Sequence, residues 1–239
     1  MSLSVKSALV VGAGGLGCPA AVGLAAAGVR YITLVDDDTI DPTNLSRQML
    51  FGDHEVGQAK SVAAAAALRL RWPSTTINPR QERLSRTAST RELIAAHDVV
   101  LDGTDNFPTR FLLSDLCVAE GVPLVHGAAL RWLGQLLTIL PGRSACLRCV
   151  FEGEPPAGAA PTCAEAGVIS PLVGIVGAWM ASEALEILHE RPPRSAGRMR
   201  VLDAWRGRER WAEVGRDPAC IACFPARVAP VSRESVAFS

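Results

Sequence analysis

Three glycines and an acidic residue near the N-terminus have the spacing of a phosphate-binding turn. Gly12, Gly14 and Gly17 directly follow an apolar run and satisfy the pattern G-x-G-x-x-G. Asp36 ends a second apolar run, the place where nucleotide-binding folds carry the acid that binds ribose hydroxyls. A strand, a glycine turn, a helix and a second strand in this order commonly cradle a nucleotide phosphate. By itself the pattern also fits a nicotinamide or flavin site, or a tight turn that binds no ligand.

Two cations separate this region from a plain dinucleotide site. Arg47 lies in a loop with Asn44 and Gln48, and Lys60 follows that loop. Transfer of a phosphoryl or nucleotidyl group requires positive charge near the leaving phosphates, whereas hydride transfer does not. Either cation alone is compatible with a solvated surface charge. Because both belong to the edge at which open α/β sheets bind ligands, we interpret them as phosphate ligands.

A second acidic turn follows a later strand. The run Asp102-Gly-Thr-Asp105-Asn106 comes directly after an apolar segment that we expect to be a buried strand ending at the same sheet edge. A carboxylate at this place can hold Mg²⁺ between phosphates. The alternative is that Asp105 or Asn106 caps the N-terminus of the following helix.

Four of the seven cysteines form two Cys-x-x-Cys pairs that lie far apart in the chain. The pairs are Cys146 with Cys149, and Cys220 with Cys223. Four thiolates at these spacings form a closed tetrahedral zinc site, which would join the C-terminal part of the chain to its middle. Redox pairs or plain buried cysteines are the alternatives. An odd number of cysteines in a chain of this size does not indicate a disulfide framework.

The other cysteines have less specific surroundings. Cys163 lies at the end of the Gly/Pro/Ala-rich segment 153–161, ahead of a long apolar helix. A thiol near a helix N-terminus can act as a nucleophile, although an inert thiol in a packed turn explains the position as well. We predict that Cys18 and Cys117 are core residues and that His126, at a strand end, is structural.

The composition is that of a folded globular protein. Of 239 residues, 49% are hydrophobic and 20% are charged. Lysine plus arginine equals aspartate plus glutamate at 24 each, which argues against a general nucleic-acid-binding protein. Lys6 and the apolar run after it imitate a secretory signal, but the glycine cluster interrupts that run. Residues 167–188 are also apolar, yet Pro171 and Glu183 favour a buried helix over a membrane span. We expect a cytoplasmic protein.

Strand and helix patterns alternate along the first half of the chain and predict an α/β fold. We expect a Rossmann-like, mainly parallel sheet with helices on both faces, and antiparallel strands toward the C-terminal half. The expected helices cover residues 17–27, 55–70, 91–97, 107–120 and 168–189, and the expected strands cover 8–11, 31–35, 75–78, 98–102, 123–126, 135–140, 199–203 and 208–211. Gly174 and Gly177 predict close packing of the last helix against a neighbour. We predict one domain over residues 1–223, a mobile loop over 153–161 and a disordered tail over 224–239.

The same motifs, in the same order, occur in a known family. They are Gly12-Ala-Gly-Gly-Leu-Gly17, Asp36-Asp-Asp-Thr-Ile-Asp41, Asn44-Leu-Ser-Arg-Gln48, Val56-Gly-Gln-Ala-Lys60, Thr104-Asp-Asn106, the two Cys-x-x-Cys pairs and Gly167-Val-Ile-Ser-Pro-Leu-Val-Gly174. The sequence resembles the E1-like adenylyltransferases of the ThiF/MoeB/HesA group, which activate ubiquitin-like sulfur carrier proteins. The resemblance extends from Ser7 to Cys223.

This resemblance implies a reaction between ATP and the C-terminal Gly-Gly carboxylate of a carrier, giving an acyl-adenylate and pyrophosphate. Arg47 and Lys60 would neutralise the leaving pyrophosphate, and Asp105 would anchor Mg²⁺. No protein base is required, because a carboxylate is already a nucleophile at neutral pH. The nucleotide-binding residues that the resemblance implies are Gly12, Gly14, Gly15, Gly17, Asp36, Asp38, Asn44, Arg47, Gln48, Lys60, Asp105 and Asn106. The expected cofactors are ATP, Mg²⁺ and a structural Zn²⁺.

The resemblance also implies partners. The carrier's tail would pass beneath the loop 153–161, and Cys163 matches a position at which some members carry a cysteine able to link to the carrier. A homodimer is implied, with no membrane and no direct nucleic-acid partner. Members usually begin with an arm that supplies an arginine to the partner subunit's nucleotide, but no arginine precedes Gly12. A short form, a substitute residue or weak activity is therefore expected. No rhodanese-like domain follows Cys223, so we expect a separate sulfur donor.

Other functions are compatible with parts of the pattern. An NAD(P)-binding Rossmann oxidoreductase would use the same glycine turn, but Arg47, Lys60 and the cysteine pairs have no role in it. A non-catalytic scaffold that binds a carrier, or an enzyme that adenylates a peptide or tRNA-bound carboxylate, would share the fold. The sequence names neither the carrier nor the pathway.

Overall fold

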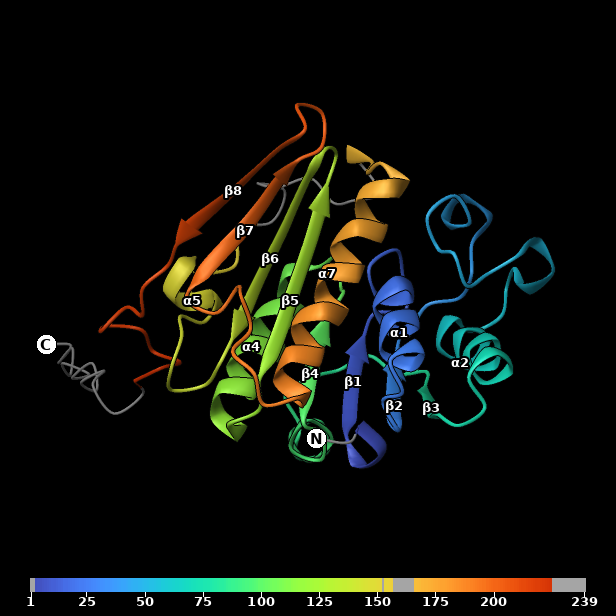
Figure 1. Cartoon of the computed structure of the whole chain (residues 1–239), viewed down its shortest axis with the longest axis horizontal. Coiled ribbons are helices and arrows are strands. Elements are labelled where there is room, and N and C mark those ends of the chain that lie inside the picture. The colour runs from blue at the N-terminus through green and yellow to red at the C-terminus, as the bar shows by residue number, and fades with distance from the viewer. Residues whose placement is uncertain (1–2, 152, 157–165, 225–239) are drawn as a thin grey trace, which may run out of the picture.

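The computed structural model describes residues 3–151, 153–156 and 166–224, and it is built around one mixed sheet (Figure 1). The eight strands of this sheet, within the described residues, lie in the order β3-β2-β1-β4-β5-β6-β7-β8. They are β1 Ser7–Val11, β2 Tyr31–Val35, β3 Thr76–Arg80, β4 Val99–Asp102, β5 Leu124–Leu130, β6 Leu133–Ile139, β7 Arg198–Asp203 and β8 Arg208–Glu213. Cys163, residues 157–161 of the predicted loop and residues 225–239 of the predicted tail lie outside the described residues.

The first five strands are parallel, and the last three add antiparallel pairs. β1 lies between β2 and β4, with β3 beyond β2 and β5 beyond β4, all in parallel register. β6, β7 and β8 then pair antiparallel in sequence order. The chain thus reverses its direction of strand addition between β1 and β4, the point at which such sheets bind ligands at their carboxyl edge. The predicted Rossmann-like sheet with antiparallel C-terminal strands is confirmed.

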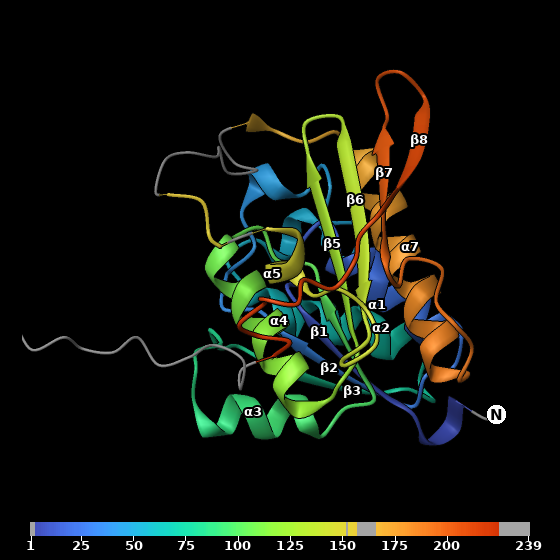
Figure 2. The same ribbon diagram turned by 90° about the vertical axis from the view of Figure 1, so that its left-hand side faces the viewer.

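Helices cover both faces of the sheet (Figures 1 and 2). The regular helices are α1 Gly17–Ala26, α2 Lys60–Arg71, α3 Ala88–Ala95, α4 Phe107–Glu120, α5 Leu147–Val150 and α7 Ser170–Leu188, with short 3-10 turns at Leu3–Val5, Pro42–Asn44 and Asp53–Glu55. Apolar residues of α1, α2 and α7 form one core layer with the sheet. Those of α3, α4 and α5 form a second layer on the opposite face. Strands buried on both faces explain the continuous apolar runs in the sequence.

The long apolar helix α7 is a core element. It packs against α1, β5 and β6. Within the described residues it is the one helix long and apolar enough to span a membrane, yet half of that apolar window is buried inside the protein. Its Glu183 carboxylate is buried and accepts a hydrogen bond from the Ser195 N–H at 2.8 Å. A Cβ at Gly177 would lie 2.4 Å from Pro19 Cγ, as the predicted close packing requires, whereas Gly174 has open space around it, so that half of the prediction is wrong.

The second predicted helix begins later than its alanine-rich pattern indicated. Residues 53–55 form only a 3-10 turn, and α2 starts at Lys60 instead of residue 55. Gly57 has a φ of 87°, which breaks a helix, and Ala59 is held extended by a bridge to Thr39. Lys60 therefore lies in the first turn of α2.

Two other boundaries moved for local reasons. The third predicted helix begins at Ala88 instead of residue 91, because the Thr87 side chain accepts the Thr90 N–H and caps it. β5 continues to Leu130 instead of ending at His126, because it forms a hairpin with β6.

Candidate functional site

A cavity of about 400 Å³ opens at the carboxyl edge of β1, β2 and β4. It brings together nearly every residue that the sequence assigned to a nucleotide site. Its lining includes Gly12, Gly14, Gly15, Asp36, Asp38, Asn44, Arg47, Gln48, Lys60, Asp105 and Asn106. Gly17 is not part of this lining and begins α1 instead. The volume falls within the range of small-molecule sites.

Close backbone contacts require glycine at two positions of this turn, whether or not a ligand binds. A Cβ at Gly17 would lie 1.7 Å from the Gly12 carbonyl oxygen. Gly12 has a φ of 90°, and a Cβ there would lie 2.9 Å from the Gly103 carbonyl oxygen. The turn after β1 and the turn after β4 therefore touch through backbone atoms. Gly14 and Gly15 line the cavity, so their amide-bearing backbone is open to a ligand.

Asp36 ties the glycine turn to the end of β2. One carboxylate oxygen accepts the Ala13 N–H at 2.6 Å and the other accepts the Asp38 N–H at 2.9 Å. Burial raises the pKa of Asp36, against the lowering effect of these amides and of the Lys60 charge. The residue thus holds the glycine turn in place while it lines the cavity.

Lys60 is a buried cation in the cavity wall. Only 6% of the residue is exposed, and its Nζ lies 2.7 Å from Asp38 Oδ2. Its own N–H donates to the Asp38 carbonyl oxygen at 3.0 Å. An ammonium group has three donors, so the bond to Asp38 leaves two for a bound anion.

The loop after β2 presents a guanidinium and an amide to the same cavity. Asp41 caps the short turn Pro42–Asn44 by accepting the Thr43 N–H at 2.8 Å, and Arg47 Nη1 donates to the Thr43 carbonyl at 3.1 Å. Gln48 donates to Asn44 Oδ1 at 3.1 Å.

One polar atom of Gln48 has no partner among the residues that the structure describes. The residue is buried, and its Oε1 has no hydrogen-bond partner within the described part of the chain. An unpaired buried polar atom costs about 1–3 kcal/mol.

The turn after β4 separates two roles that the sequence left open. Asn106 is the N-cap of α4, and its Oδ1 accepts the Thr109 N–H at 3.0 Å. The capping alternative therefore holds for Asn106. Asp105 is exposed, and its carboxylate has no hydrogen bond or ion pair to any residue that the structure describes. Its oxygens suit a hard cation such as Mg²⁺, which proteins commonly bind through one or two carboxylates and substrate phosphates.

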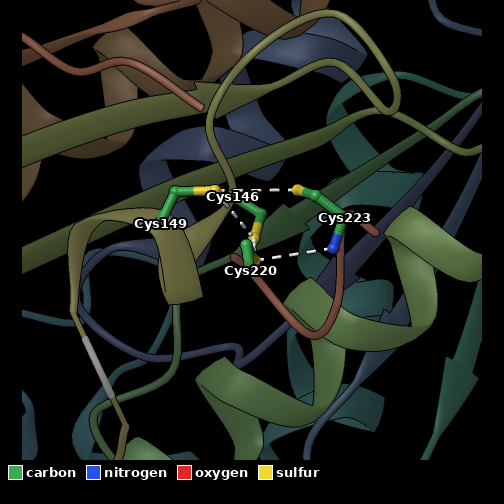
Figure 3. Close-up of side chains that lie close together, drawn as sticks. All are labelled: Cys146, Cys149, Cys220 and Cys223. Carbon is green, nitrogen blue, oxygen red and sulfur yellow. Dashed lines mark hydrogen bonds between the residues drawn. The ribbon is translucent and has the colours of Figure 1, made fainter. Parts of the chain in front are cut away.

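The four paired cysteines form one cluster (Figure 3), and none of them lines the cavity. Their sulfur atoms all lie within 4.8 Å of one another. Cys146 Sγ lies 3.8 Å from Cys149 Sγ and 3.5 Å from Cys220 Sγ, and the sulfurs of Cys149 and Cys223 are 3.7 Å apart. Tetrahedral zinc with bonds of about 2.3 Å requires sulfurs roughly 3.8 Å apart. The cluster is compatible with a zinc site of four thiolates, and all four cysteines are free thiols.

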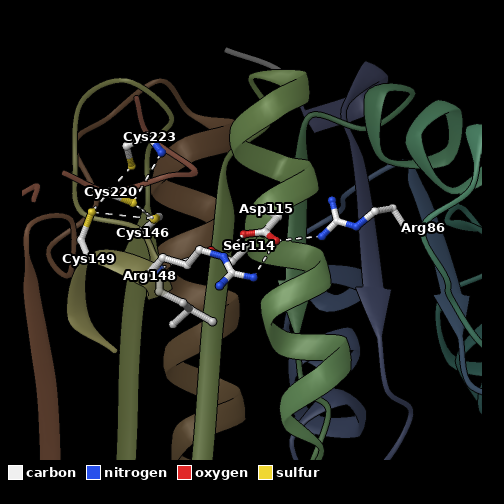
Figure 4. A network of polar contacts seen from close by, with 9 residues as sticks. Arg86, Ser114, Asp115, Cys146, Arg148, Cys149, Cys220 and Cys223 are labelled. Carbon is white, nitrogen blue, oxygen red and sulfur yellow. Dashed lines mark hydrogen bonds and ion pairs between the residues drawn. The ribbon is translucent and has the colours of Figure 1, made fainter. Parts of the chain in front are cut away.

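The cysteine cluster is fastened to α4 (Figure 4). Arg148 lies between the first two cysteines, and its Nε and Nη2 donate to the two carboxylate oxygens of Asp115 at 2.7 and 3.0 Å. Arg86 donates to the same carboxylate from the linker after β3 at 2.8 Å. Ser114 Oγ accepts the Leu147 N–H at 3.2 Å. One helix thus contributes to the cavity at its N-terminus and supports the cluster further along its length.

A family model described as the ThiF family matches residues 2–222 of this sequence. The chain belongs to the ThiF family. This match confirms the family resemblance that the motifs indicated. The matched residues include the cavity and all of the cysteine cluster except Cys223.

Curated relatives of this ThiF-family chain carry adenylyltransferase and E1 names. It is 43% identical to adenylyltransferase and sulfurtransferase MOCS3 of Bos taurus over 93% of this chain and 49% of the relative. It is 41% identical to the SAMP-activating enzyme E1 of Haloferax volcanii over 90% of this chain and 79% of the relative. It is 38% identical to the sulfur carrier protein adenylyltransferase of Thermus thermophilus over 92% of this chain and 83% of the relative. The chain spans about half the length of MOCS3.

Solved structures share the fold of the ThiF-family chain. The crystal structure of E. coli MccB with ATP matches 92% of this chain and 67% of that protein with a TM-score of 0.80 at 20% identity. The crystal structure of PaaA matches 89% of this chain and 65% of that protein, with a TM-score of 0.73 at 18% identity. At these identities the likeness concerns architecture alone.

Several residues in the cavity wall and behind it were not predicted from the sequence. Arg83 and Arg110 line it, although neither belongs to a motif that we singled out. Asp102, the last residue of the predicted strand 98–102, was given no role, yet it is fully buried and pairs with His126 at 2.7 Å. The available signal was its place at the end of a buried strand, the same place that drew attention to Asp36. His126 is buried, as the structural interpretation of that residue predicted.

Proposed function

We propose that this protein adenylates the C-terminal Gly-Gly carboxylate of a ubiquitin-like sulfur carrier protein. The carboxylate oxygen attacks the α-phosphorus of ATP, the bond from that phosphorus to the bridging oxygen breaks, and pyrophosphate leaves. The products are a carrier acyl-adenylate and pyrophosphate. The names of the MOCS3, SAMP-activating E1 and sulfur carrier adenylyltransferase relatives support this substrate class.

One observation carries the proposal. Arg47, Lys60 and Asp105 come from three separate segments of the chain, and all line the same cavity, together with the glycine turn. A redox dinucleotide site has no use for two cations and an unpaired carboxylate in these places, whereas pyrophosphate release does. This convergence is the reason to prefer nucleotidyl transfer to oxidoreduction.

The residues act by position and charge. The backbone at Gly14 and Gly15 would meet the phosphates, Asp36 the ribose hydroxyls, and Asn44 and Gln48 the flank of the nucleotide. Asp105 would hold Mg²⁺, which would supply positive charge to neutralise the phosphates.

The two cations would stabilise the negative charge that develops on the leaving pyrophosphate. Lys60 is held by Asp38, so it needs little reorganisation to meet the pyrophosphate, and Arg47 adds a second positive charge. The attacking carboxylate is ionised at neutral pH, so no general base is needed.

The wider setting is part of the proposal. We expect a cytoplasmic homodimer that receives sulfur from a separate donor protein, with one structural Zn²⁺ on Cys146, Cys149, Cys220 and Cys223. The free thiols of the described cysteines agree with a reducing compartment. Cys163 remains a candidate for a covalent link to the carrier.

Mass spectrometry of candidate carriers tests the reaction directly. Gly-Gly carriers incubated with the protein, ATP and Mg²⁺ should gain one AMP, and Arg47→Ala and Lys60→Ala should each reduce this gain by at least about a hundredfold. Arg206→Ala is a matched control, because this exposed arginine forms an ion pair with Asp203 and neither residue lines the cavity. Cys163→Ser tests separately whether a carrier–enzyme adduct forms.

The alternatives give different results. Nicotinamide binding without pyrophosphate exchange would indicate an oxidoreductase. Binding of ATP and a carrier with no adenylate would indicate a non-catalytic scaffold.

A further inference from the structure

We propose that Asp102 and His126 form a buried positioning pair that fixes the turn carrying Asp105, and thereby sets the affinity of the cavity for the Mg²⁺ complex of its nucleotide. The proposal rests on the proposed nucleotide site, because it assigns a supporting role to residues behind that site. Neither residue lines the cavity.

The register between β4 and β5 brings the two residues of the pair together. Asp102 is the last residue of β4 and lies directly opposite His126 of β5 in the parallel ladder. Both side chains point to the face covered by α4, since alternate residues of β5 pack on the other face against α7. His126 Nδ1 lies 2.7 Å from Asp102 Oδ2, and Asp102 has no exposed surface.

The second oxygen of Asp102 holds the turn itself. Asp102 Oδ1 accepts the Thr104 N–H at 3.0 Å and the Thr104 hydroxyl at 2.7 Å. From the other side, the Thr104 carbonyl accepts Arg110 Nε at 3.2 Å and Nη2 at 2.9 Å. Thr104 and Arg110 both line the cavity. The backbone immediately before Asp105 is therefore clamped between a buried carboxylate and a guanidinium.

Asp105 needs such support from its neighbours. Its carboxylate is exposed and has no bond to any other described residue, so the position of its backbone is what neighbouring residues can fix. A metal ligand must be held close to its productive geometry by the surrounding shell. The Asp102 carboxylate supplies that shell, and His126 is the donor that satisfies its otherwise unpaired inner oxygen.

The charges around the pair agree with this role. Arg110 on α4 is the nearby cation, and Cys117 on the same helix is a neutral buried thiol. Three donors and one cation surround one carboxylate, so the group is stable as an anion and can accept all its bonds at once.

A second buried carboxylate provides a matched control. Glu183 on α7 is also buried and accepts bonds from Ser195 and Thr138, but it lines no part of the cavity. If burial alone mattered, Glu183→Gln and His126→Leu would have the same consequences.

The test is isothermal titration of the full-length protein with a non-hydrolysable ATP analogue, with and without Mg²⁺, together with thermal unfolding. His126→Leu should weaken binding of the Mg²⁺ complex by about tenfold or more and change metal-free binding much less. His126→Asn, which retains a donor, should recover most of the loss. Glu183→Gln should lower the melting temperature and leave Mg²⁺ dependence unchanged.

A melting temperature lowered in His126→Leu with unchanged Mg²⁺ dependence would overturn the proposal, because the pair would then be only structural. If His126→Leu does not fold, Thr104→Val removes the hydroxyl contact to Asp102 and should raise the Mg²⁺ requirement in the same direction; an unchanged requirement would again overturn it. These readouts need no carrier turnover. A wild-type protein that binds Mg²⁺ and nucleotide but never adenylates a carrier would therefore refute the proposed function and leave this inference standing.

Discussion

The glycines of the glycine turn have two different structural roles. Gly12 and Gly17 allow backbone to meet backbone, since a Cβ at either would lie within 2.9 Å of a carbonyl oxygen. Gly14 has no such conflict, because a Cβ there would meet only the flexible end of Gln48 at 3.7 Å. The glycine motif is thus partly a folding requirement and partly an opening for a ligand.

This distinction predicts unequal effects of two similar substitutions. Gly17→Ala places a Cβ 1.7 Å from the Gly12 carbonyl oxygen and should destabilise the fold by at least about 3 kcal/mol, because backbone cannot rotate away. Gly14→Ala should change stability by less than about 1 kcal/mol. Urea denaturation of both variants measures the difference. Equal losses would contradict the assignment of the two roles.

Asp102 should make stability depend on acid pH. Burial disfavours its charge, but the hydrogen bond and charge of His126, the charge of Arg110 and the Thr104 hydroxyl outweigh this and lower its pKa. Because the folded pKa lies below the unfolded value of about 3.9, its contribution is complete above that pH and is lost as the pH falls through the folded pKa.

The matching experiment compares wild type with Asp102→Asn in urea between about pH 3 and pH 7. The variant should be less stable by about 2–4 kcal/mol at neutral pH, and the difference should shrink below about pH 4. A difference that stays constant over this range would show that the carboxylate charge does not stabilise the fold.

Among the elements, α4 is the one that joins the two sites. Its N-cap Asn106 and its first-turn residue Arg110 lie at the cavity, and Ser114 and Asp115 further along hold the segment between the first two cysteines. Asp115 is largely buried and makes a bidentate pair with Arg148, while Arg86 reaches it from a mostly exposed position. One helix therefore supports both the cavity rim and the cysteine cluster.

Asp115→Ala should therefore loosen the cysteine cluster. Loss of a largely buried, bidentate partner should cost about 1–3 kcal/mol and speed the release of zinc to a colorimetric chelator. Arg86→Gln is the control, because its exposed contact to the same carboxylate should contribute less than about 1 kcal/mol. Identical zinc-release rates in both variants would refute the role of the Arg148 pair.

At the scale of the whole molecule, the cysteine cluster connects the segment after β6 to the segment after β8. Cys146 and Cys220 are 74 positions apart, and the chain between them contains α7, β7 and β8. A cross-link that closes a loop of this length restricts the unfolded chain by roughly 4 kcal/mol. The fold of the C-terminal half should therefore depend on the metal.

Removal of the metal tests this dependence. The purified protein should contain one zinc per chain by elemental analysis, and a strong chelator or Cys146→Ser should lower the melting temperature by several degrees. Added zinc should restore the wild-type protein and not the variant. A metal-free protein with an unchanged melting temperature would rule out a structural zinc.

The sequence by itself determined the sheet class, the glycine turn, the cations and the two cysteine pairs. These features are local: φ-demanding glycines, apolar runs and Cys-x-x-Cys spacing report their chemistry within a few residues. The helix Phe107–Glu120 could be placed to the residue, because Asn106 and Gly121 are strong cap signals at its two ends.

Only the tertiary structure decided which buried groups meet. The start of α2 at Lys60 depends on a bridge between Thr39 and Ala59 that no local pattern reveals. The pairing of Asp102 with His126 depends on the register of two strands that are apolar on both faces, and such strands carry no alternation from which register can be read. Contacts between distant segments follow from packing, and for that reason the residues behind the site became visible only in three dimensions.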